Sequence, residues 1–285
     1  MDETLAGSWK QVEQAIDRAL AEDLSFGDVT TEALIPPEQQ GRASIIARGE
    51  GVLAGVEVAK AVFLKVDPSM RFEASVEDGA KVRKKDVVAV IEGKVASILK
   101  GERVALNFLT RLSGIASETA RYVEATKGLK VRITDTRKTT PGIRVLEKYA
   151  VRVGGGKSHR HHLGDGILIK DNHLAALRSL GVELKEAIEK ARQRSTLQIE
   201  VEVEIVEQAQ VALEAGADVI MLDNMAIEDM RRVIELAQGR ALIEASGGIT
   251  LDNVRQVAEV GVDLISVGAL THSARSLDLS LELEA

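Results

Sequence analysis

The sequence contains no cysteine, few aromatic residues and no long apolar run, and each absence removes a class of protein. Without cysteine, the 285 residues form no disulfide scaffold, Cys-ligated zinc site, iron–sulfur cluster or thiol nucleophile. Aromatic residues make up 2% of the chain, so there are few platforms on which nucleic-acid bases could stack, and the net charge is −7. We therefore expect no nucleic-acid partner.

No apolar run approaches the roughly 18 residues that a membrane span requires. The polar start of the sequence, residues 1–4, lacks the basic and then apolar pattern of a signal peptide. We therefore expect no membrane partner and a cytoplasmic location, which the lack of cysteine also favours. With 45% apolar and 28% charged residues, the composition is that of a folded globular protein.

Charge is unevenly distributed along the chain. Residues 132–173 contain nine Lys and Arg but four Asp and Glu, and they also contain four of the five histidines. A basic concentration in an otherwise acidic protein favours an anionic small ligand. The alternative is a solvated surface patch.

Residues 1–112 are predicted to form an N-terminal α+β open-sandwich domain. The apolar spacing predicts helices at residues 8–23 and 56–66, and short strands at residues 44–47, 70–76, 87–91 and 95–99. A long helix is expected at residues 101–126, with a break or kink at Ser113 and Gly114.

Residues 113–270 are predicted to form an incomplete, seven-stranded α/β barrel of the TIM-like kind. Glu202, Asp223, Ser246 and Gly268 follow successive strands at intervals of 21 to 23 residues, the length of one β/α unit. Strands are expected at residues 131–134, 150–153, 167–169, 199–203, 219–222, 241–245 and 264–267. The tail, residues 271–285, is expected to pack back on the N-terminal domain.

Polar or small residues follow each of these strands. In parallel barrels the functional groups lie at the carboxyl ends of the strands, and a charge buried there is costly unless it is paired or meets a ligand. We therefore expect one site at these ends. Its candidate residues are Arg137, Lys138, Ser158, His159, Arg160, Lys170, Glu202, Asp223, Ser246, Gly247, Gly248, Gly268, Ala269 and Leu270.

The last two strand ends predict a phosphate site. Ser246, Gly247, Gly248 and Gly268 would present backbone N–H groups to an anion. Barrels commonly bind phosphate after their final two strands. His272 follows closely enough in sequence to serve as a counter-cation.

The charged members of the set predict a ligand with several charges. Arg137 and Arg160 can each bind a carboxylate through two parallel hydrogen bonds, and the lysines after the first and third strands add point charges. Glu202 and Asp223 offer acceptors for ribose hydroxyls, a metal or a developing positive charge. The alternative for these two acids is salt bridges with neighbouring Lys or Arg.

His159, His161 and His162 form a cluster that raises the question of a metal. No acid follows at the spacing of the H-E-x-x-H motif, and Arg160 separates the first two histidines. We expect no tightly held metal here, and His159 is interpreted as a donor that contacts the ligand.

Eight segments of the sequence, in the same order along the chain, resemble segments of the quinolinate phosphoribosyltransferase family, also called nicotinate-nucleotide pyrophosphorylases (carboxylating). The similarity extends over nearly the whole chain. Two departures lie beside the expected site: Ser158 stands where many members carry Asn, and His161 and His162 replace a commonly small or Leu-rich stretch. The segments are residues 101–107, 134–142, 152–160, 168–173, 201–204, 221–224, 244–249 and 266–268.

The resemblance implies a pentosyltransferase of de novo NAD biosynthesis. It would join quinolinate to 5-phosphoribosyl-1-pyrophosphate and form nicotinate mononucleotide, pyrophosphate and carbon dioxide. It also implies Mg²⁺ bound with the pyrophosphate and not held tightly by the protein, no organic cofactor, and a homodimer or a hexamer with sites shared between subunits. The N-terminal domain would lie over a neighbouring subunit's barrel mouth.

The same resemblance assigns roles by motif. Quinolinate would be bound by Arg103, Arg137, Lys138, His159, Arg160 and Lys170. The catalytic residues would be Lys138, Lys170, Glu202 and Asp223, of which the two acids face the ribose. The phosphoribosyl group would also contact Ser246, Gly247, Gly248, Gly268, Ala269, Leu270 and His272.

Three alternatives remain open at this point. A paralogue associated with molybdenum-transport operons shares much of the motif pattern. A Schiff-base aldolase would use Lys170 as its nucleophile. A non-enzymatic sensor of a phosphoribosyl ligand would bind without turnover.

Overall fold

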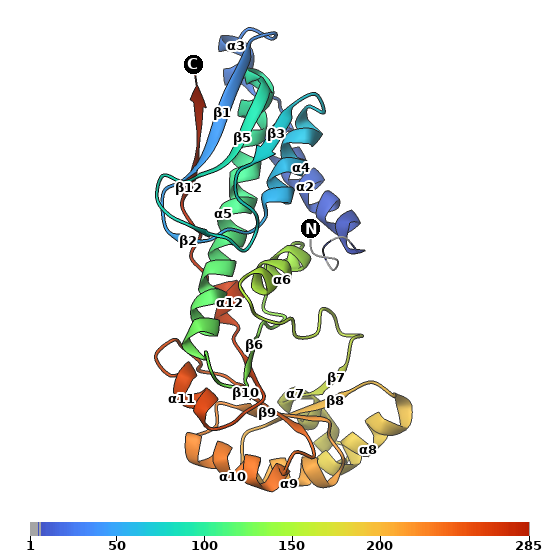
Figure 1. Ribbon diagram of the computed structural model, residues 1–285. Coiled ribbons are helices and arrows are strands. Elements are labelled where there is room, and N and C mark those ends of the chain that lie inside the picture. Colours follow the sequence, from blue (N-terminus) through green and yellow to red (C-terminus); the bar gives the residue numbers. More distant parts are fainter. Residues whose placement is uncertain (1–4, 6, 285) are drawn as a thin grey trace. The chain divides into compact units, whose positions relative to one another are not determined.

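The computed structural model describes residue 5 and residues 7–284, which divide into two compact units built from separate stretches of chain (Figure 1). Within this described part, no helix is both long and apolar enough to span a lipid bilayer. The domain boundaries expected from the sequence stay predictions. The first unit comprises Met1–Ala120, Lys138–Gly155 and Ala269–Ala285, and the second comprises Arg121–Arg137 and Gly156–Gly268.

The first unit contains a four-stranded antiparallel sheet in the order β12-β1-β5-β3. β1 (Gln40–Ala47) pairs with β5 (Val87–Lys94) on one side and with β12 (Leu279–Glu284) on the other. β3 (Arg71–Ala74) lies at the far edge beside β5. Because β12 comes from the end of the chain, the C-terminal segment is a structural strand of this unit.

Helices α2, α3 and α4 and a two-stranded pair belong to the N-terminal part of this unit. Helix α4 buries Val58, Ala59, Val62 and Phe63, the spacing of one helical face, so its predicted range is confirmed. The predicted first helix is also confirmed to within a residue at each end. The elements are α2 (Trp9–Leu24), α3 (Val29–Leu34), α4 (Val56–Val66), β2 (Gly51–Val52) and β4 (Lys81–Val82).

Helix α5 (Val95–Ala125) is continuous and longer than predicted. The strand expected at residues 95–99 is wrong, because Val95 and Ile98 are both buried at the spacing of a helical face. The break expected at Ser113 and Gly114 is also wrong. The Ser113 hydroxyl accepts a hydrogen bond from the N–H of Ala54 at 3.0 Å, and a Cβ at Gly114 would collide with the Arg275 carbonyl. These small residues therefore allow close packing.

The second unit contains a six-stranded parallel sheet with helices between the strands. The strand order is β6-β11-β10-β9-β8-β7, and the sheet's central strands bury Val201, Ile220, Leu222 and Ala245 completely. The strands are β6 (Arg132–Thr134), β7 (Ile167–Ile169), β8 (Ile199–Val203), β9 (Val219–Asp223), β10 (Leu242–Ser246) and β11 (Leu264–Ser266). The helices are α7 (Asp171–Arg178), α8 (Leu184–Arg194), α9 (Val206–Glu214), α10 (Ile227–Ala237) and α11 (Val254–Glu259).

The strand expected at residues 150–153 is wrong, so this sheet has six hydrogen-bonded strands and not seven. These residues complete helix α6 (Arg144–Val153), which buries Leu146, Tyr149 and Ala150 at helical spacing. Only Lys157 forms a strand-like bridge, with Thr134 of β6. Closure of the sheet into a barrel stays a prediction.

Candidate active site

Lys170 and Glu202 form an ion pair at the carboxyl end of the parallel sheet. Lys170 directly follows β7, and Ile169 of β7 lies opposite Val201 of β8, so the next residues of both strands lie side by side. Nζ of Lys170 lies 2.5 Å from Oε2 of Glu202, whose side chain is 12% exposed. The salt bridge that the sequence left open as an alternative for Glu202 is therefore present.

Asp223 and Ser246 end neighbouring strands, and a glycine loop follows them. The N–H of Asn224 donates to the Ser246 carbonyl at 2.9 Å, and its amide nitrogen donates to the Asp223 carboxylate at 3.0 Å. Gly247 and Gly248 have φ angles of +82° and +64°, and a Cβ at Gly247 would collide with the Asn224 side chain. Within the described chain, neither glycine N–H donates a hydrogen bond, so both are available to an anion.

Asn224 was not among the predicted site residues, although it supports that loop. Its φ of +51° is a backbone conformation that Asn adopts more readily than most residues. The signal in the sequence was an Asn directly after the strand-end Asp223.

Backbone contacts attach the His159 segment to β6. The Lys157 N–H donates to the Ile133 carbonyl at 2.8 Å, and the Asp135 N–H donates to the Lys157 carbonyl at 3.2 Å. The buried carboxylate of Asp135 accepts a hydrogen bond from the His159 N–H at 2.8 Å. Asp135, a further residue missed from the sequence, therefore fixes the position of His159.

Arg137 and Arg160 lie close enough to influence each other's charge. Burial lowers the pKa of the Arg160 guanidinium, and the positive charge of Arg137 lowers it further. Nη1 of Arg160 also donates to the Gly166 carbonyl at 3.2 Å. Two cations that repel each other favour a ligand that brings negative charge between them.

His159, Glu200 and Glu244 form a compact cluster, and the two acids were not predicted. Nε2 of His159 lies 3.2 Å from Oε2 of Glu200 and 3.5 Å from Oε2 of Glu244. Glu244 is fully buried, and neither of its carboxylate oxygens accepts a hydrogen bond within the described chain. The sequence signal for each of these acids was a Glu inside an apolar strand, where a buried charge is costly unless it is paired or binds a ligand.

These carboxylates decide the charge of His159. Burial lowers the pKa of the ring, but the interactions with Glu200 and Glu244 outweigh burial and raise the pKa to about 10. The Arg160 N–H, 2.9 Å from Nδ1, favours the neutral ring. Protonation of the ring gives up this hydrogen bond, but the two carboxylates within 3.5 Å of Nε2 outweigh it. His159 is therefore an imidazolium at neutral pH.

The same cluster is the group of residues closest to a metal site. The possible ligand atoms of its three residues all lie within 4.8 Å of one another. A metal ion would have to displace the proton that Nε2 shares with the carboxylates. His161 and His162 belong to a separate turn, in which Asp165 accepts hydrogen bonds from both backbone N–H groups.

His159 and Arg160 line a cavity of about 420 Å³ in the second unit. Its wall includes the first residues of five strands as well as Thr134, the last residue of β6. The first residues of the strands are Arg132, Ile167, Val219, Leu242 and Leu264.

Five predicted site residues belong to the first unit. Arg103 lies on α5, Lys138 directly follows Arg137 in sequence, and Ala269, Leu270 and His272 form part of the short helix α12 (Ala269–His272). Within this unit, Thr271 Oγ1 donates to the Lys138 carbonyl at 2.9 Å. The structure therefore brings α12 and the backbone of Lys138 together.

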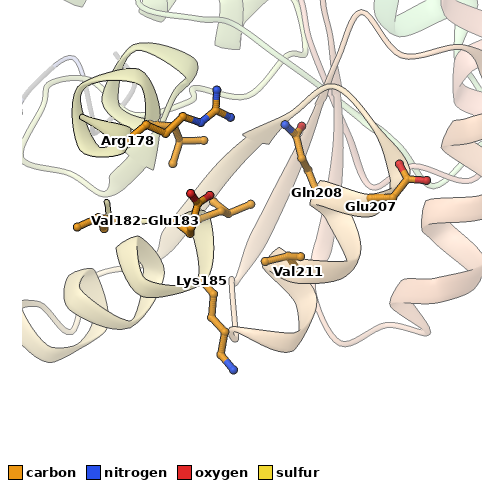
Figure 2. A pocket seen from close by; sticks show the side chains of 9 residues that line it. Arg178, Val182, Glu183, Lys185, Glu207, Gln208 and Val211 are labelled. Atoms are coloured by element: carbon orange, nitrogen blue, oxygen red, sulfur yellow. The ribbon is translucent and has the colours of Figure 1, made fainter. Parts of the chain in front are cut away.

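A second cavity, of about 270 Å³, lies among α7, α8 and α9, and Figure 2 shows its lining. Arg178 and Lys185 line it from one side, and Glu207, Gln208 and Val211 from the other. None of the predicted site residues is part of its lining. This cavity is therefore separate from the candidate active site.

The fold and the site together define a class of protein. It is an α/β protein whose parallel-sheet unit carries carboxylates, an open glycine loop and clustered guanidinium groups that suit a ligand with several charges. Two family models match the chain, the quinolinate phosphoribosyl transferase N-terminal domain over residues 28–113 and the C-terminal domain over residues 115–282. The chain therefore belongs to the quinolinate phosphoribosyltransferase family.

Individual relatives agree with this membership. A probable nicotinate-nucleotide pyrophosphorylase (carboxylating) of Bacillus subtilis is 44% identical over 96% of this chain and 93% of its own. The enzyme of that name from Mycobacterium leprae is 43% identical over 94% of this chain and 95% of its own. The crystal structure of NadC from Streptococcus pyogenes matches with a TM-score of 0.91 and 44% identity, and the match covers 96% of each chain.

Proposed function

We propose that the protein joins quinolinate to 5-phosphoribosyl-1-pyrophosphate, giving nicotinate mononucleotide, pyrophosphate and carbon dioxide. The ring nitrogen forms a bond to C1 of the ribose as the bond to pyrophosphate breaks. The 2-carboxylate leaves as carbon dioxide, its electron pair passes to the ring carbon, and a proton takes its place. This reaction belongs to the de novo synthesis of NAD.

The observation that carries the proposal is the pair of mutually repelling guanidinium groups, Arg137 and Arg160, in a chain of net charge −7. Burial and the positive charge of Arg137 both lower the pKa of Arg160, and a dicarboxylate would neutralise the charge of the pair. His159 lies in the same unit, but its charge is already paired with Glu200 and Glu244 and adds no net positive charge. A ligand with two carboxylates, such as quinolinate, matches this set.

The remaining roles follow the family motifs. Quinolinate is bound by Arg137, Lys138, His159, Arg160 and Lys170, with Arg103 supplied by the partner subunit of a homodimer. The open N–H groups of the glycine loop bind the 5-phosphate together with Ser246, Gly268, Ala269, Leu270 and His272.

Glu202 and Asp223 act on the ribose. Departure of pyrophosphate leaves positive charge on C1, and carboxylates fixed nearby stabilise it without moving. Lys170 holds Glu202 in place through their ion pair. Neither acid acts as a general base in this step, because the pyridine nitrogen of quinolinate carries no proton to remove.

The residues present also fit a magnesium ion that arrives with the pyrophosphate. Mg²⁺ usually takes one or two carboxylates together with phosphate oxygens. Glu202 is already paired with Lys170, so Asp223 is the carboxylate that this chain would offer. The ion would neutralise charge on the leaving group.

The parallel sheet would close into an incomplete barrel, because side chains of β8 and β10 both contact His159 from the segment next to β6. We place the protein in the cytoplasm, as a homodimer or a hexamer of such dimers. Hybrid dimers of an Arg103→Ala chain with a Lys170→Ala chain recover activity if Arg103 acts across the interface. Hybrids that form without recovery contradict the shared site.

An aldolase that uses Lys170 fits less well. A Schiff base needs a neutral amine, whereas this ammonium is paired with Glu202 at 2.5 Å. Borohydride with a sugar phosphate should therefore trap no covalent adduct.

The direct test is turnover of quinolinate labelled with ¹³C in its 2-carboxylate, in the presence of phosphoribosyl pyrophosphate and Mg²⁺. We expect nicotinate mononucleotide, pyrophosphate and labelled carbon dioxide in equal amounts. Tight binding without product would favour a sensor. Transfer to another acceptor, with quinolinate unused, would contradict the substrate assignment.

A further inference from the structure

Glu147 is a fully buried carboxylate whose two oxygens are both occupied. Oε1 accepts hydrogen bonds from Arg111 Nη2 at 2.8 Å and from the Thr140 hydroxyl at 2.8 Å. Oε2 accepts the Thr140 N–H at 2.9 Å. The Glu147 carboxylate on α6 is thus paired with Arg111 and hydrogen-bonded to Thr140 in the loop that precedes the helix.

Arg111, on α5, completes the connection on the other side. Its Nη1 donates to the Ala274 carbonyl at 3.1 Å, and its Nη2 also donates to the Thr271 carbonyl. The five N–H donors of a planar guanidinium can reach a carboxylate and two carbonyls together, which an ammonium on a flexible stem does not match. Arg111 and Glu147 therefore connect α5, α6 and the segment at residues 271–274.

The attached segments carry two predicted site residues. Thr140 lies two residues beyond Lys138, and Thr271 directly precedes His272. The Thr271 hydroxyl closes the arrangement by donating to the Lys138 carbonyl at 2.9 Å. Helix α12 has only four residues, too few to be stable without such contacts.

We infer that Arg111 and Glu147 are positioning residues that set the backbone of Lys138 and His272 for the phosphoribosyl half of the reaction. This inference rests on the proposed function. Neither side chain touches substrate, and both act through the loop at Lys138–Thr140 and the turn at Thr271–Ala274. Quinolinate depends less on them, because only Lys138 of its binding residues adjoins the attached segments, whereas Ala269, Leu270 and His272 of the phosphoribosyl set all lie in α12.

Arg111→Lys is the principal variant, because it keeps the positive charge and removes the forked contacts. Loss of hydrogen bonds to a charged group should raise the KM for phosphoribosyl pyrophosphate by about tenfold or more. The KM for quinolinate should change by much less. Thr140→Val, which keeps the shape and removes one contact to Glu147, should act in the same direction with a smaller effect, and it keeps the test decisive if the lysine variant does not fold.

Arg48→Lys is the matched control. Arg48 also holds the C-terminal segment, through a 2.7 Å hydrogen bond to Ser280, but within the described residues its side chain bonds Ser280 and Glu282 and not the turn at residues 271–274. It should lower thermal stability while leaving both KM values unchanged. A purely structural role for Arg111 would give the same pattern as this control.

A double variant identifies the route. If Arg111 acts through the turn, Arg111→Lys combined with His272→Ala should raise the KM by clearly less than the product of the two single effects. If the double variant raises the KM by the full product of the two single effects, the inference is wrong. It is also wrong if Arg111→Lys changes the KM for phosphoribosyl pyrophosphate and the KM for quinolinate equally. Failure of the wild-type protein to form nicotinate mononucleotide would contradict the proposed function instead, so the two failures are distinguishable.

Discussion

Two fully buried glutamates, one in each unit, have opposite surroundings. Glu147 in the first unit accepts hydrogen bonds from a guanidinium, a hydroxyl and a backbone N–H. Glu244 in the second unit lies 3.5 Å from Nε2 of His159, and its oxygens accept no hydrogen bond within the described residues. Both charges bear the cost of leaving water, but only Glu147 is fully compensated by its neighbours.

The difference separates two uses of a buried charge. Glu147 fixes a loop and a turn, so its removal should be felt first in stability. Glu244 is poorly compensated as a structural group, and its main effect is on the charge of His159. A buried acid without hydrogen bonds therefore indicates a site that sets the charge of a neighbour.

The largest expected effect comes from Glu147→Ala. It leaves Arg111 without its carboxylate and the Thr140 N–H without its acceptor, which should lower the free energy of unfolding by about 3–5 kcal/mol. Urea denaturation measures this change. Glu124→Ala is the control, because Glu124 forms an exposed pair with Lys127, and it should cost less than about 1 kcal/mol. Equal losses in both variants would contradict the structural role of Glu147.

Arg137→Ala and Arg160→Ala should act on the substrate and not on the fold. Each removes a cation expected to bind a desolvated carboxylate, which corresponds to on the order of 2–5 kcal/mol in kcat/KM for quinolinate. The melting temperature should change little. Arg255→Ala, at an exposed pair with Glu259, should leave kinetics unchanged. Unchanged kinetics in both site variants would overturn the quinolinate assignment.

Glu202→Gln should lower kcat by roughly 10²–10³, because it removes a fixed charge that stabilises the ribosyl cation. Quinolinate affinity should change much less, and the pH profile of the residual activity should keep its shape. Glu204→Gln, just beyond the same strand, is the control. Loss of a titrating limb of the kcat profile would show instead that Glu202 transfers a proton.

A pH dependence of stability should come from His159. Its folded-state pKa is raised to about 10, above the usual 6.5, so its contribution is complete below about pH 6.5 and is lost as the pH rises toward 10. The slope for one proton is at most about 1.4 kcal/mol per pH unit. Compared with wild type, His159→Asn should lose less stability across this range in urea denaturation. If the unfolding free energies of the wild type and of His159→Asn changed with pH in parallel, the raised pKa of His159 would be contradicted.

Local patterns in the sequence predicted much of the second unit. The ranges of β7 and β8 match the expected strands at residues 167–169 and 199–203, because short apolar runs between helices leave little ambiguity. Residues 95–99 and 150–153 were wrong for the opposite reason. Both are apolar segments that fit a strand as well as a buried helix face, and tertiary packing decided between them.

The candidate site was predicted in part. The strand-end residues Lys170, Glu202 and Asp223 follow from β/α spacing, and the structure places them at the carboxyl end of the sheet. Glu200, Glu244 and Arg111 were missed, because their partners lie between 36 and 163 residues away and no local pattern records such contacts. The contacts of His159 with Glu200 and Glu244 could not be read from the sequence for the same reason.

The most direct test of the contrast between the two glutamates is an NMR titration of the His159 imidazole. With five histidines in the chain, ¹⁵N-labelled ring signals can be assigned with single variants. We expect a pKa near 10 in the wild-type protein, a clearly lower value in Glu244→Gln, and an unchanged value in Glu147→Gln. A wild-type pKa near 6.5, or equal responses to the two variants, would contradict the account.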